Sequence, residues 1–278
     1  MLSYFSLSLL LTLLTSQFQR GNCNESSINT IGESKNQKSP PFDFLPAAKD
    51  GNLKYLKEKI ELFISQGGDL QTLREMTNHE GDTALILAAT EGHYFTSLLL
   101  IESKVVDVNA VNGMGYTALH CASAKNHSIL AAHLIPLTAA RRVNLGTVSQ
   151  GMTPLLYACR NRNLDLIRQL LIGVRGANLG QTNLRGDSCL HLALSTQDVV
   201  FIEALLDLGA ELNGRGARGR TVLMEAIRRE LPDIVQLLVS RGADLRSKDE
   251  MQQDAFTYAV ATGNESLVVL IRKAIRTS

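Results

Sequence analysis

The 278-residue chain contains no tryptophan, and aromatic residues make up only 5% of it. Proteins that bind single-stranded nucleic acid stack bases on aromatic rings, and cages for quaternary amines need such rings as well. The chain is poorly supplied for either kind of site. It also lacks an excess of one charge, because 28 Lys and Arg residues stand against 27 Asp and Glu, a formal net charge of +1. Since nucleic-acid binding depends on many phosphate contacts, this balance argues against a polyanion binder held by bulk charge.

Motifs that carry catalysis or metal binding are missing too. No cysteine pair has the spacing of a zinc site, and no histidine belongs to an H-E-x-x-H pair. The strings G-x-S-x-G and G-K-[ST] do not occur. One G-x-G-x-x-G string spans residues 214–219, but residues 211–213 (Glu-Leu-Asn) are not the buried strand that a dinucleotide-binding turn follows. The sequence therefore predicts no enzyme, no metal site and no cofactor, and a loop at 214–219.

A short phrase recurs along the chain. It begins with glycine, has Thr or Ser two positions later and Leu four positions later, and is followed by alanine. Successive glycines are separated by 34, 36, 35 and 33 residues, which is the length of a supersecondary unit repeated in series. The glycines that open the phrase are Gly81, Gly115, Gly151, Gly186 and Gly219.

The residues of one unit have mechanical reasons for their positions. Gly151 suits a turn with positive φ, Thr153 suits the N-cap of a first helix, and Pro154 suits its first position, where a missing N–H costs nothing. The small Ala158 lets a second helix approach closely, and Gly176 should end that helix. The apolar face of the second helix is expected to consist of Leu166, Ile167, Leu170 and Leu171.

The repeated phrase resembles the T-P-L-H-x-A signature of the ankyrin repeat. The resemblance covers residues 44–278 and implies an all-α solenoid of helix-turn-helix repeats with short hairpin loops. We expect seven units: a degenerate cap from Phe44 with a lengthened second helix, five units opened by the glycines above, and a last cap near Gln252. In the unit that Gly219 opens, Pro232 should begin the second helix.

The segment before the repeats divides into two parts. Residues 1–19 resemble a signal peptide, because Phe5 to Leu14 is apolar and too short to span a membrane comfortably, although no Lys or Arg precedes Arg20. Residues 20–43 are rich in Asn, Ser, Lys and Pro, which predicts a disordered linker. We expect a secretory or extracellular protein without a stable membrane span. The alternative is a cytoplasmic protein in which residues 1–43 are an irrelevant extension.

The cysteines and histidines are expected to be structural. Three cysteines fall within the first-helix phrases of three units, where they should be small buried hydrophobic residues and not a disulfide framework. Cys23 lies before the repeats, next to the glycosylation sequon at Asn24. By the resemblance, His120 and His191 occupy the motif histidine, whose imidazole makes structural hydrogen bonds. The three cysteines of the phrases are Cys121, Cys159 and Cys189.

The resemblance implies a protein partner, because ankyrin repeats usually bind through the hairpin tips and the exposed side of the first helices. At these positions the later units are rich in arginine. We hypothesise that this half of one concave face docks an acidic or phosphorylated segment, since guanidinium groups bind carboxylate and phosphate bidentately. The alternative is a solvated charged face. The predicted partner-binding residues are Arg160, Arg185, Arg218, Arg220, Arg228 and Arg229, with Tyr116 and Met152.

The expected function is that of a non-catalytic protein-protein interaction module, and we expect a monomer. Two further possibilities remain open at this stage: a cytosolic regulatory or scaffold subunit, and a secreted effector or toxin that acts on host proteins. The fold alone does not name a partner.

Overall fold

The computed structural model describes residues 42–173 and 177–277. The predicted leader, nearly all of the predicted linker, Cys23, the sequon at Asn24 and the helix stop at Gly176 lie outside the described residues. Phe42, two residues before the start predicted for the repeats, already packs against the rings of Phe44, Tyr55 and Phe63, with centroids 5.7, 6.5 and 6.3 Å away.

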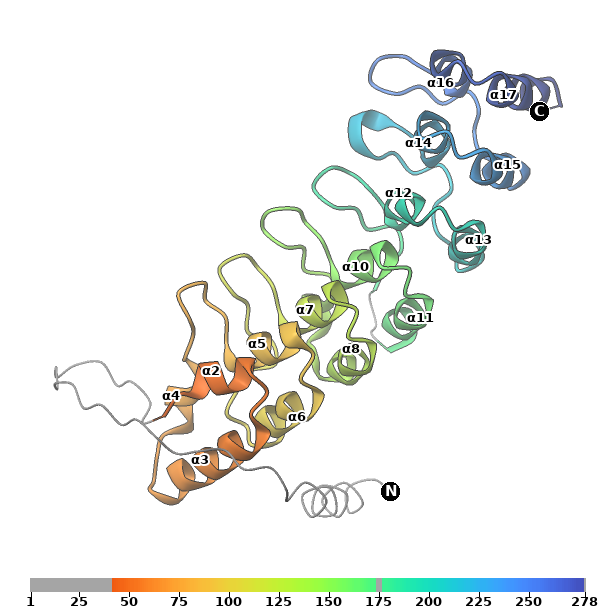
Figure 1. Ribbon diagram of the computed structural model, residues 1–278. Coiled ribbons are helices and arrows are strands. Elements are labelled where there is room, and N and C mark those ends of the chain that lie inside the picture. The colour runs from red at the N-terminus through yellow and green to blue at the C-terminus, as the bar shows by residue number, and fades with distance from the viewer. Residues whose placement is uncertain (1–41, 174–176, 278) are drawn as a thin grey trace. The chain divides into compact units, whose positions relative to one another are not determined.

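In the described residues the fold is the expected all-α stack of seven helix pairs, shown in Figure 1. The first helices of the pairs are α2 (Phe44–Lys49), α5 (Ala84–Glu91), α7 (Ala118–Ala124), α10 (Pro154–Arg160), α12 (Cys189–Ala193), α14 (Val222–Arg228) and α16 (Ala255–Thr262). The second helices are α3 (Leu53–Ser65), α6 (Tyr94–Glu102), α8 (Ser128–Leu134), α11 (Leu164–Gly173), α13 (Val199–Asp207), α15 (Pro232–Ser240) and α17 (Glu265–Thr277).

Short additional helices occur in the connections. They are α4 (Leu70–Arg74), α9 (Ala140–Val143) and three 3₁₀ segments, Ile135–Leu137, Leu194–Thr196 and Ala217–Gly219. The loops contain no named strand within the described ranges, only one antiparallel bridge between Arg215 and Thr221. The cap units deviate as expected, since α3 has 13 residues where the second helix of the next pair has 9.

The first helices start where the repeated phrase predicts. Thr153 Oγ1 accepts a hydrogen bond from the Leu156 N–H at 3.2 Å, and Pro154 is the first residue of α10. Gly151 has φ +64°, and a Cβ there would lie 2.9 Å from the backbone of Leu184, so this turn requires glycine for two reasons. Pro232 likewise begins α15. These local predictions are confirmed.

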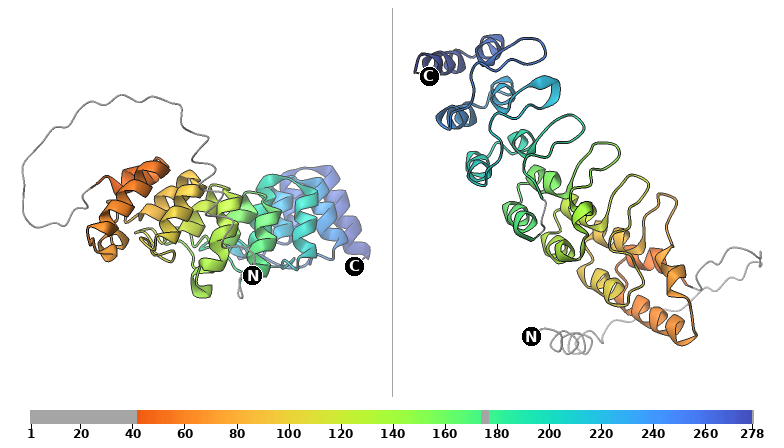
Figure 2. Two further views of the ribbon diagram at one scale, coloured as in Figure 1. Left: turned by 90° about the horizontal axis from the view of Figure 1, so that it is seen from below. Right: turned by 180° about the vertical axis from the view of Figure 1, so that it is seen from behind.

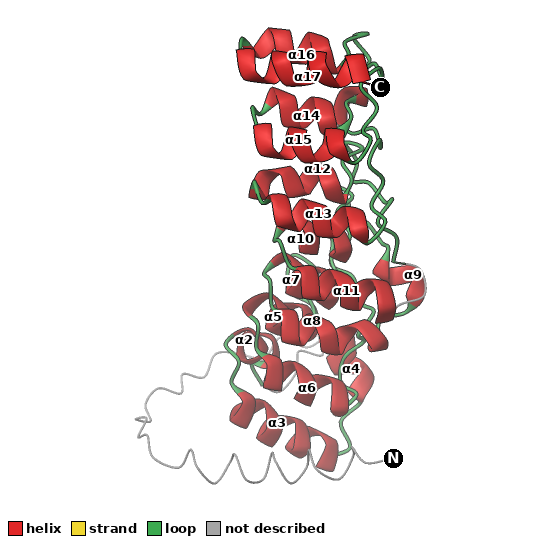
Figure 3. Cartoon of the chain, turned by 90° about the vertical axis from the view of Figure 1, so that its right-hand side faces the viewer, coloured by secondary structure: helices red, strands yellow, loops and turns green. Residues whose placement is uncertain are grey.

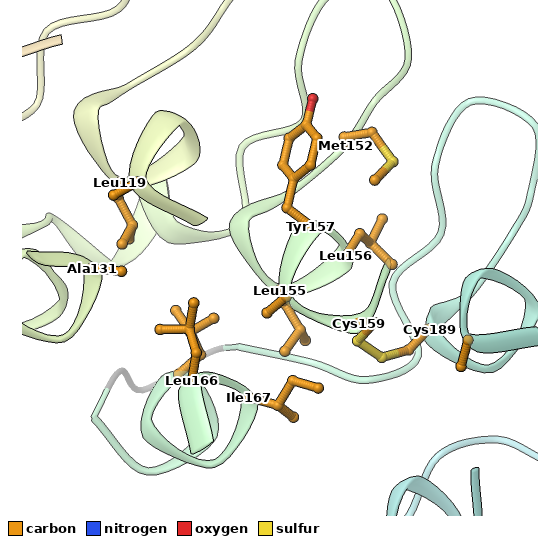
Figure 4. Packing of buried hydrophobic residues seen from close by; sticks show 14 of the residues in the cluster. Leu119, Ala131, Met152, Leu155, Leu156, Tyr157, Cys159, Leu166, Ile167 and Cys189 are labelled. Carbon is orange, nitrogen blue, oxygen red and sulfur yellow. A yellow bond between two sulfur atoms is a disulfide. The ribbon is translucent and has the colours of Figure 1, made fainter. Parts of the chain in front are cut away.

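The helices form two rows with the hairpin loops on one side. The first helices lie beside the hairpins and the second helices form the other row, as two further views show (Figure 2). All hairpins project from the same side of the stack (Figure 3). We call the surface formed by the first helices and the hairpins the first-helix face. Buried Leu, Ile, Val and Ala side chains from both rows form one continuous core between neighbouring pairs (Figure 4), so each pair is stabilised by its neighbours.

Hydrogen bonds join successive units at both ends of the first helices. At the hairpins, the Val148 N–H donates to the Met114 carbonyl and the Glu250 N–H to the Arg218 carbonyl, at 2.9 and 3.1 Å. At the opposite ends, His127 Nε2 lies 3.1 Å from the Thr90 carbonyl. The repeats are thus linked through polar contacts as well as through the core.

The cysteine prediction is partly wrong. Cys159 and Cys189 are fully buried as expected, but they form a disulfide between α10 and α12 (Figure 4). The cause is the packing of neighbouring first helices, which brings the last turn of α10 against the first turn of α12 and leaves the two Cα atoms 5.4 Å apart. Cys121 remains a buried thiol, and burial raises its pKa to about 11.

None of the helices described here is both long enough and apolar enough to cross a membrane.

Candidate functional site

The motif histidines are structural. The Thr117 N–H and hydroxyl lie 3.2 and 2.8 Å from His120 Nδ1, and His120 Nε2 lies 2.6 Å from the Leu145 carbonyl. The backbone N–H requires Nδ1 to accept, so Nε2 carries the proton. Burial lowers the pKa of His120 to about 4, although the hydrogen bond to the Leu145 carbonyl acts to raise it. His191 repeats this arrangement with Ser188 and the Arg220 carbonyl.

The G-x-G-x-x-G string forms a hairpin loop, as predicted. Gly216 N–H donates to the Arg220 carbonyl at 2.7 Å, and residues 217–219 form a 3₁₀ turn. Helix α14 starts only after Thr221, so these glycines shape the turn between two repeats. Within the described ranges, no three His, Cys, Asp or Glu side chains are grouped so that they could hold a metal ion.

The later units contain a cavity of about 310 Å³ on the first-helix face. It lies between α10, α12, α14 and the hairpins that precede α12 and α14. Five of the six arginines predicted from the sequence lie around it, whereas Arg218 does not. The lining residues are Arg160, Arg185, Asp187, His191, Leu192, Ser195, Ala217, Arg220, Glu225, Arg228 and Arg229.

Glu225 organises three of these arginines. Its side chain is 9% exposed, and its Oε1 accepts from a terminal nitrogen of Arg228 at 2.6 Å and from Arg229 Nε at 2.8 Å. Its Oε2 accepts from Arg228 Nε at 3.0 Å and lies 3.3 Å from Arg220 Nε. Burial alone would raise the pKa of Glu225, but the hydrogen bonds and charges of Arg228 and Arg229 outweigh it and lower the pKa to about 2. Glu225 is therefore ionised at neutral pH.

Arg160 and Arg185 line the cavity from other elements. Arg160 ends α10, and its guanidinium lies over the Tyr157 ring, 4.9 Å from the centroid. Arg185 precedes Gly186 in a hairpin and is exposed. Neither forms an ion pair with a carboxylate in the described part of the chain. These two side chains are therefore the least neutralised cations of the cavity.

The charges around the cavity do not cancel. Asp187 and Glu225 are the two carboxylates of the lining. Asp249, which interacts with Arg220 from outside the lining, supplies a third carboxylate. Burial alone would raise the pKa of Asp249. Hydrogen bonds from Tyr258 and the backbone, together with the charge of Arg220, outweigh burial and lower this pKa. Burial lowers the pKa of His191, which is therefore neutral. Five guanidinium groups against three carboxylates leave two positive charges.

Two predicted partner-binding residues are placed differently from expectation. Met152 is only 2% exposed, so the prediction that it forms part of the binding surface is wrong. Tyr116 is half-buried, with its hydroxyl 2.7 Å from that of Tyr157. The reason is shared: the residue after the positive-φ glycine leads into the N-cap and turns inward, whereas the exposed tip lies before the glycine. Asp82, at the same position in its unit, is also buried.

The binding residues predicted from the sequence do not include Glu225, although its spacing to two arginines predicts that it pairs with them. It stands three and four residues before Arg228 and Arg229, the spacing at which oppositely charged side chains meet on a helix. Its contact with Arg220 has no such local signal, because Arg220 lies in the hairpin. Ala217 and Leu192 also line the cavity without a sequence pattern that would single them out.

The repeated helix pairs, the hairpins and the exposed first-helix face define a helical repeat protein of the ankyrin type. The family description "Ankyrin repeats (3 copies)" matches residues 46–141, 106–181, 137–215 and 155–249. These overlapping matches cover more than half of the chain, and the chain belongs to the ankyrin repeat family. Domains of this family are generally protein-protein interaction modules and typically non-catalytic.

Two curated relatives illustrate the range of the similarity. The mouse (Mus musculus) "B-cell lymphoma 3 protein homolog" is 28% identical over 191 residues, which is 68% of this chain and 41% of that protein. The "Putative ankyrin repeat protein YahD" of Escherichia coli (strain K12) is 28% identical over 217 residues, 74% of this chain and 98% of that protein. The chain thus spans less than half of the mouse protein and nearly all of the bacterial one.

Solved structures show the same fold. The ankyrin repeat domain of Bcl-3, described as a unique member of the IkappaB protein family, superimposes with a TM-score of 0.69 at 24% identity, covering 85% of this chain and 100% of that domain. The human ASB11 ankyrin repeat domain gives 0.65 at 22% identity, covering 82% and 97%. At these identities the similarity concerns the fold alone.

Proposed function

We propose that this protein is a non-catalytic binding module that docks an acidic segment of a partner protein in the arginine-lined cavity of its first-helix face. The observation that supports this proposal is the gathering of Arg160, Arg185, Arg228 and Arg229 around one cavity, from two helices (α10 and α14) and a hairpin. A merely solvated charged face would spread its cations. Planar guanidinium groups also match the two oxygens of a carboxylate.

The pairing within the cavity supports the same function. Glu225 holds Arg228 and Arg229 in place through three hydrogen bonds, so these side chains lose little further freedom when a ligand binds. Arg160 and Arg185 form no ion pair with a carboxylate of the described residues. A second carboxylate of the ligand can therefore bind them without displacing an internal partner. The excess positive charge of the cavity also favours an acidic partner over a basic one.

The proposal is tested by binding a fluorescein-labelled peptide of alternating Glu and Ser to the full-length protein. The decisive variant is Arg160→Glu with Arg185→Glu, which we expect to weaken binding at least about tenfold. Arg218→Glu is the control, because it makes one Arg-to-Glu change on the same side of the stack outside the cavity. It is compared with the single variants Arg160→Glu and Arg185→Glu, which change the charge by the same amount. Equal binding by wild type and the double variant would reject the proposal. A loss in both variants would indicate bulk charge only.

We further propose that the protein works in an oxidising compartment. The Cys159–Cys189 disulfide supports this, because structural disulfides persist in secretory and extracellular environments and are rare in the cytosol. The apolar stretch from Phe5 to Leu14 supports it independently. N-terminal sequencing of the protein from its native cells, together with cell fractionation, is the test. A cytosolic protein that retains Met1 and carries free Cys159 and Cys189 thiols would reject the assignment and favour a cytosolic scaffold subunit.

A further inference from the structure

We infer that the arginine cavity recognises one phosphoryl group on its partner segment, so that binding depends on phosphorylation of a single side chain. This inference rests on the proposed function and specifies its ligand.

The charge balance fits a phosphate monoester better than a carboxylate. With the carboxylates of Asp187, Glu225 and Asp249 counted, the five arginines leave two positive charges. A phosphoryl group carries about −1.5 to −2 at neutral pH, whereas a carboxylate carries −1. One bound phosphoryl group therefore nearly neutralises the cavity, while one carboxylate leaves one positive charge without a counterpart.

The supply of hydrogen-bond donors also exceeds what a carboxylate can use. Each guanidinium has five N–H groups. Glu225 occupies Nε and one terminal nitrogen of Arg228 but only Nε of Arg229, so the remaining N–H groups of both are left for other acceptors. Arg220 Nε is buried and paired with Glu225 Oε2 at 3.3 Å, so the spare donors come from the other arginines. Three phosphoryl oxygens accept more of these donors than two carboxylate oxygens do.

The cavity has room for the group and for the carbon atoms that carry it. Its volume of about 310 Å³ is far above the ~10–15 Å³ that a cavity needs to hold one water. Leu192 and Ala217 give it an apolar part, next to the arginines. The Ser195 hydroxyl donates to the Leu192 carbonyl at 2.7 Å, so the arginines remain the main donors.

The test compares three labelled peptides that differ only at the central residue: serine, glutamate or phosphoserine, flanked by glycine and serine. With the full-length protein, we expect the phosphoserine peptide to bind at least about tenfold more tightly than the glutamate peptide. Inorganic phosphate should compete with it more strongly than sodium chloride at equal ionic strength. Equal affinity for phosphoserine and glutamate peptides would overturn the inference and leave the proposed acidic docking intact.

Variants separate the cavity from bulk charge. Arg160→Glu with Arg185→Glu should lose the preference for phosphoserine, whereas Arg218→Glu should keep it. Arg160→Lys with Arg185→Lys keeps the charge but loses the planar fork, and should retain only part of the preference. Unchanged phosphopeptide affinity in the double glutamate variant would reject both this inference and the proposed function. Circular dichroism and thermal unfolding of each variant establish that it is folded.

Discussion

Cys159 in the last turn of α10 and Cys189 at the start of α12 are bonded across two repeats, 30 residues apart in the sequence. Arg160 follows the first cysteine directly, and His191 and Leu192 follow the second within three residues. The disulfide therefore joins two walls of the arginine cavity, and it closes a loop that contains the whole of α11.

Removing this disulfide should lower stability. For a loop of this length, chain entropy predicts a loss of about 3–4 kcal/mol in the double variant Cys159→Ala with Cys189→Ala. Urea unfolding under non-reducing conditions measures the effect. Cys121→Ala is the control, because it removes a buried thiol without a bond and should cost about 1 kcal/mol. A double variant no less stable than the control would contradict the stabilising role of the bond.

Neutralising Glu225 should destabilise the fold near the cavity. In Glu225→Gln, three arginines lose their shared carboxylate, and we expect the free energy of unfolding to fall by about 2 kcal/mol at pH 7. The effect is smaller than for a fully buried ion pair because the Arg228 side chain is 48% exposed. Glu203→Gln, whose partner Arg241 lies on the surface, should lower the free energy of unfolding much less, because solvent screens this pair. Because the folded pKa of Glu225 is about 2, its contribution is present above pH 4.5 and is lost as the pH falls toward 2. The difference between wild type and Glu225→Gln should therefore shrink in acid; a difference independent of pH would contradict this.

His120 should make the stability of the fold depend on pH between about 4 and 6.5, a higher interval than the one in which Glu225 acts. Its folded pKa of about 4 lies below the ordinary histidine pKa of 6.5, so the unfolded chain binds the proton more readily between these values. Stability is then full above about pH 6.5 and falls as the pH decreases toward 4, by about 2 kcal/mol at pH 5. Urea unfolding at pH 7 and pH 5 measures it. In His120→Gln this decrease should be smaller; an unchanged decrease would assign it to other groups.

Met152 should affect stability and not binding. Because its side chain is 2% exposed, Met152→Ala should cost about 2–3 kcal/mol through lost burial and the cavity left behind. The affinity for an acidic peptide should stay within about twofold of wild type at a temperature where both are folded. A tenfold weaker affinity without loss of stability would restore Met152 to the binding surface.

Much of the fold can be predicted from the sequence because the same turn and helix-capping residues recur in each unit. Thr153, Pro154 and Gly151 each act within a few residues of themselves, as cap, first helical residue and turn, and recur in phase. The boundaries of α10 and α15 follow from such residues. The gathering of Arg160, Arg185, Arg228 and Arg229 also follows, since each occupies a repeat position on the same face.

The remainder depends on contacts between units that no single repeat encodes. Cys159 and Cys189 occupy different positions within their repeats, so only the packing of α10 on α12 brings them together. The inward turn of Met152 depends on the hairpin's backbone, which its residue type does not indicate. The contact between Arg220 and Glu225 joins a hairpin to a helix and has no spacing rule.

We expect an acidic partner segment to bind in the arginine cavity and at no other part of the first-helix face. NMR of the arginine Nε–Hε groups, while the phosphoserine peptide is titrated into the full-length protein, tests this most directly. We expect saturable shifts of the Arg160, Arg185 and Arg229 signals with one shared dissociation constant, and no shift at Arg218. Saturable shifts at Arg218, or in the units from α2 to α7, with the cavity arginines unchanged would contradict it.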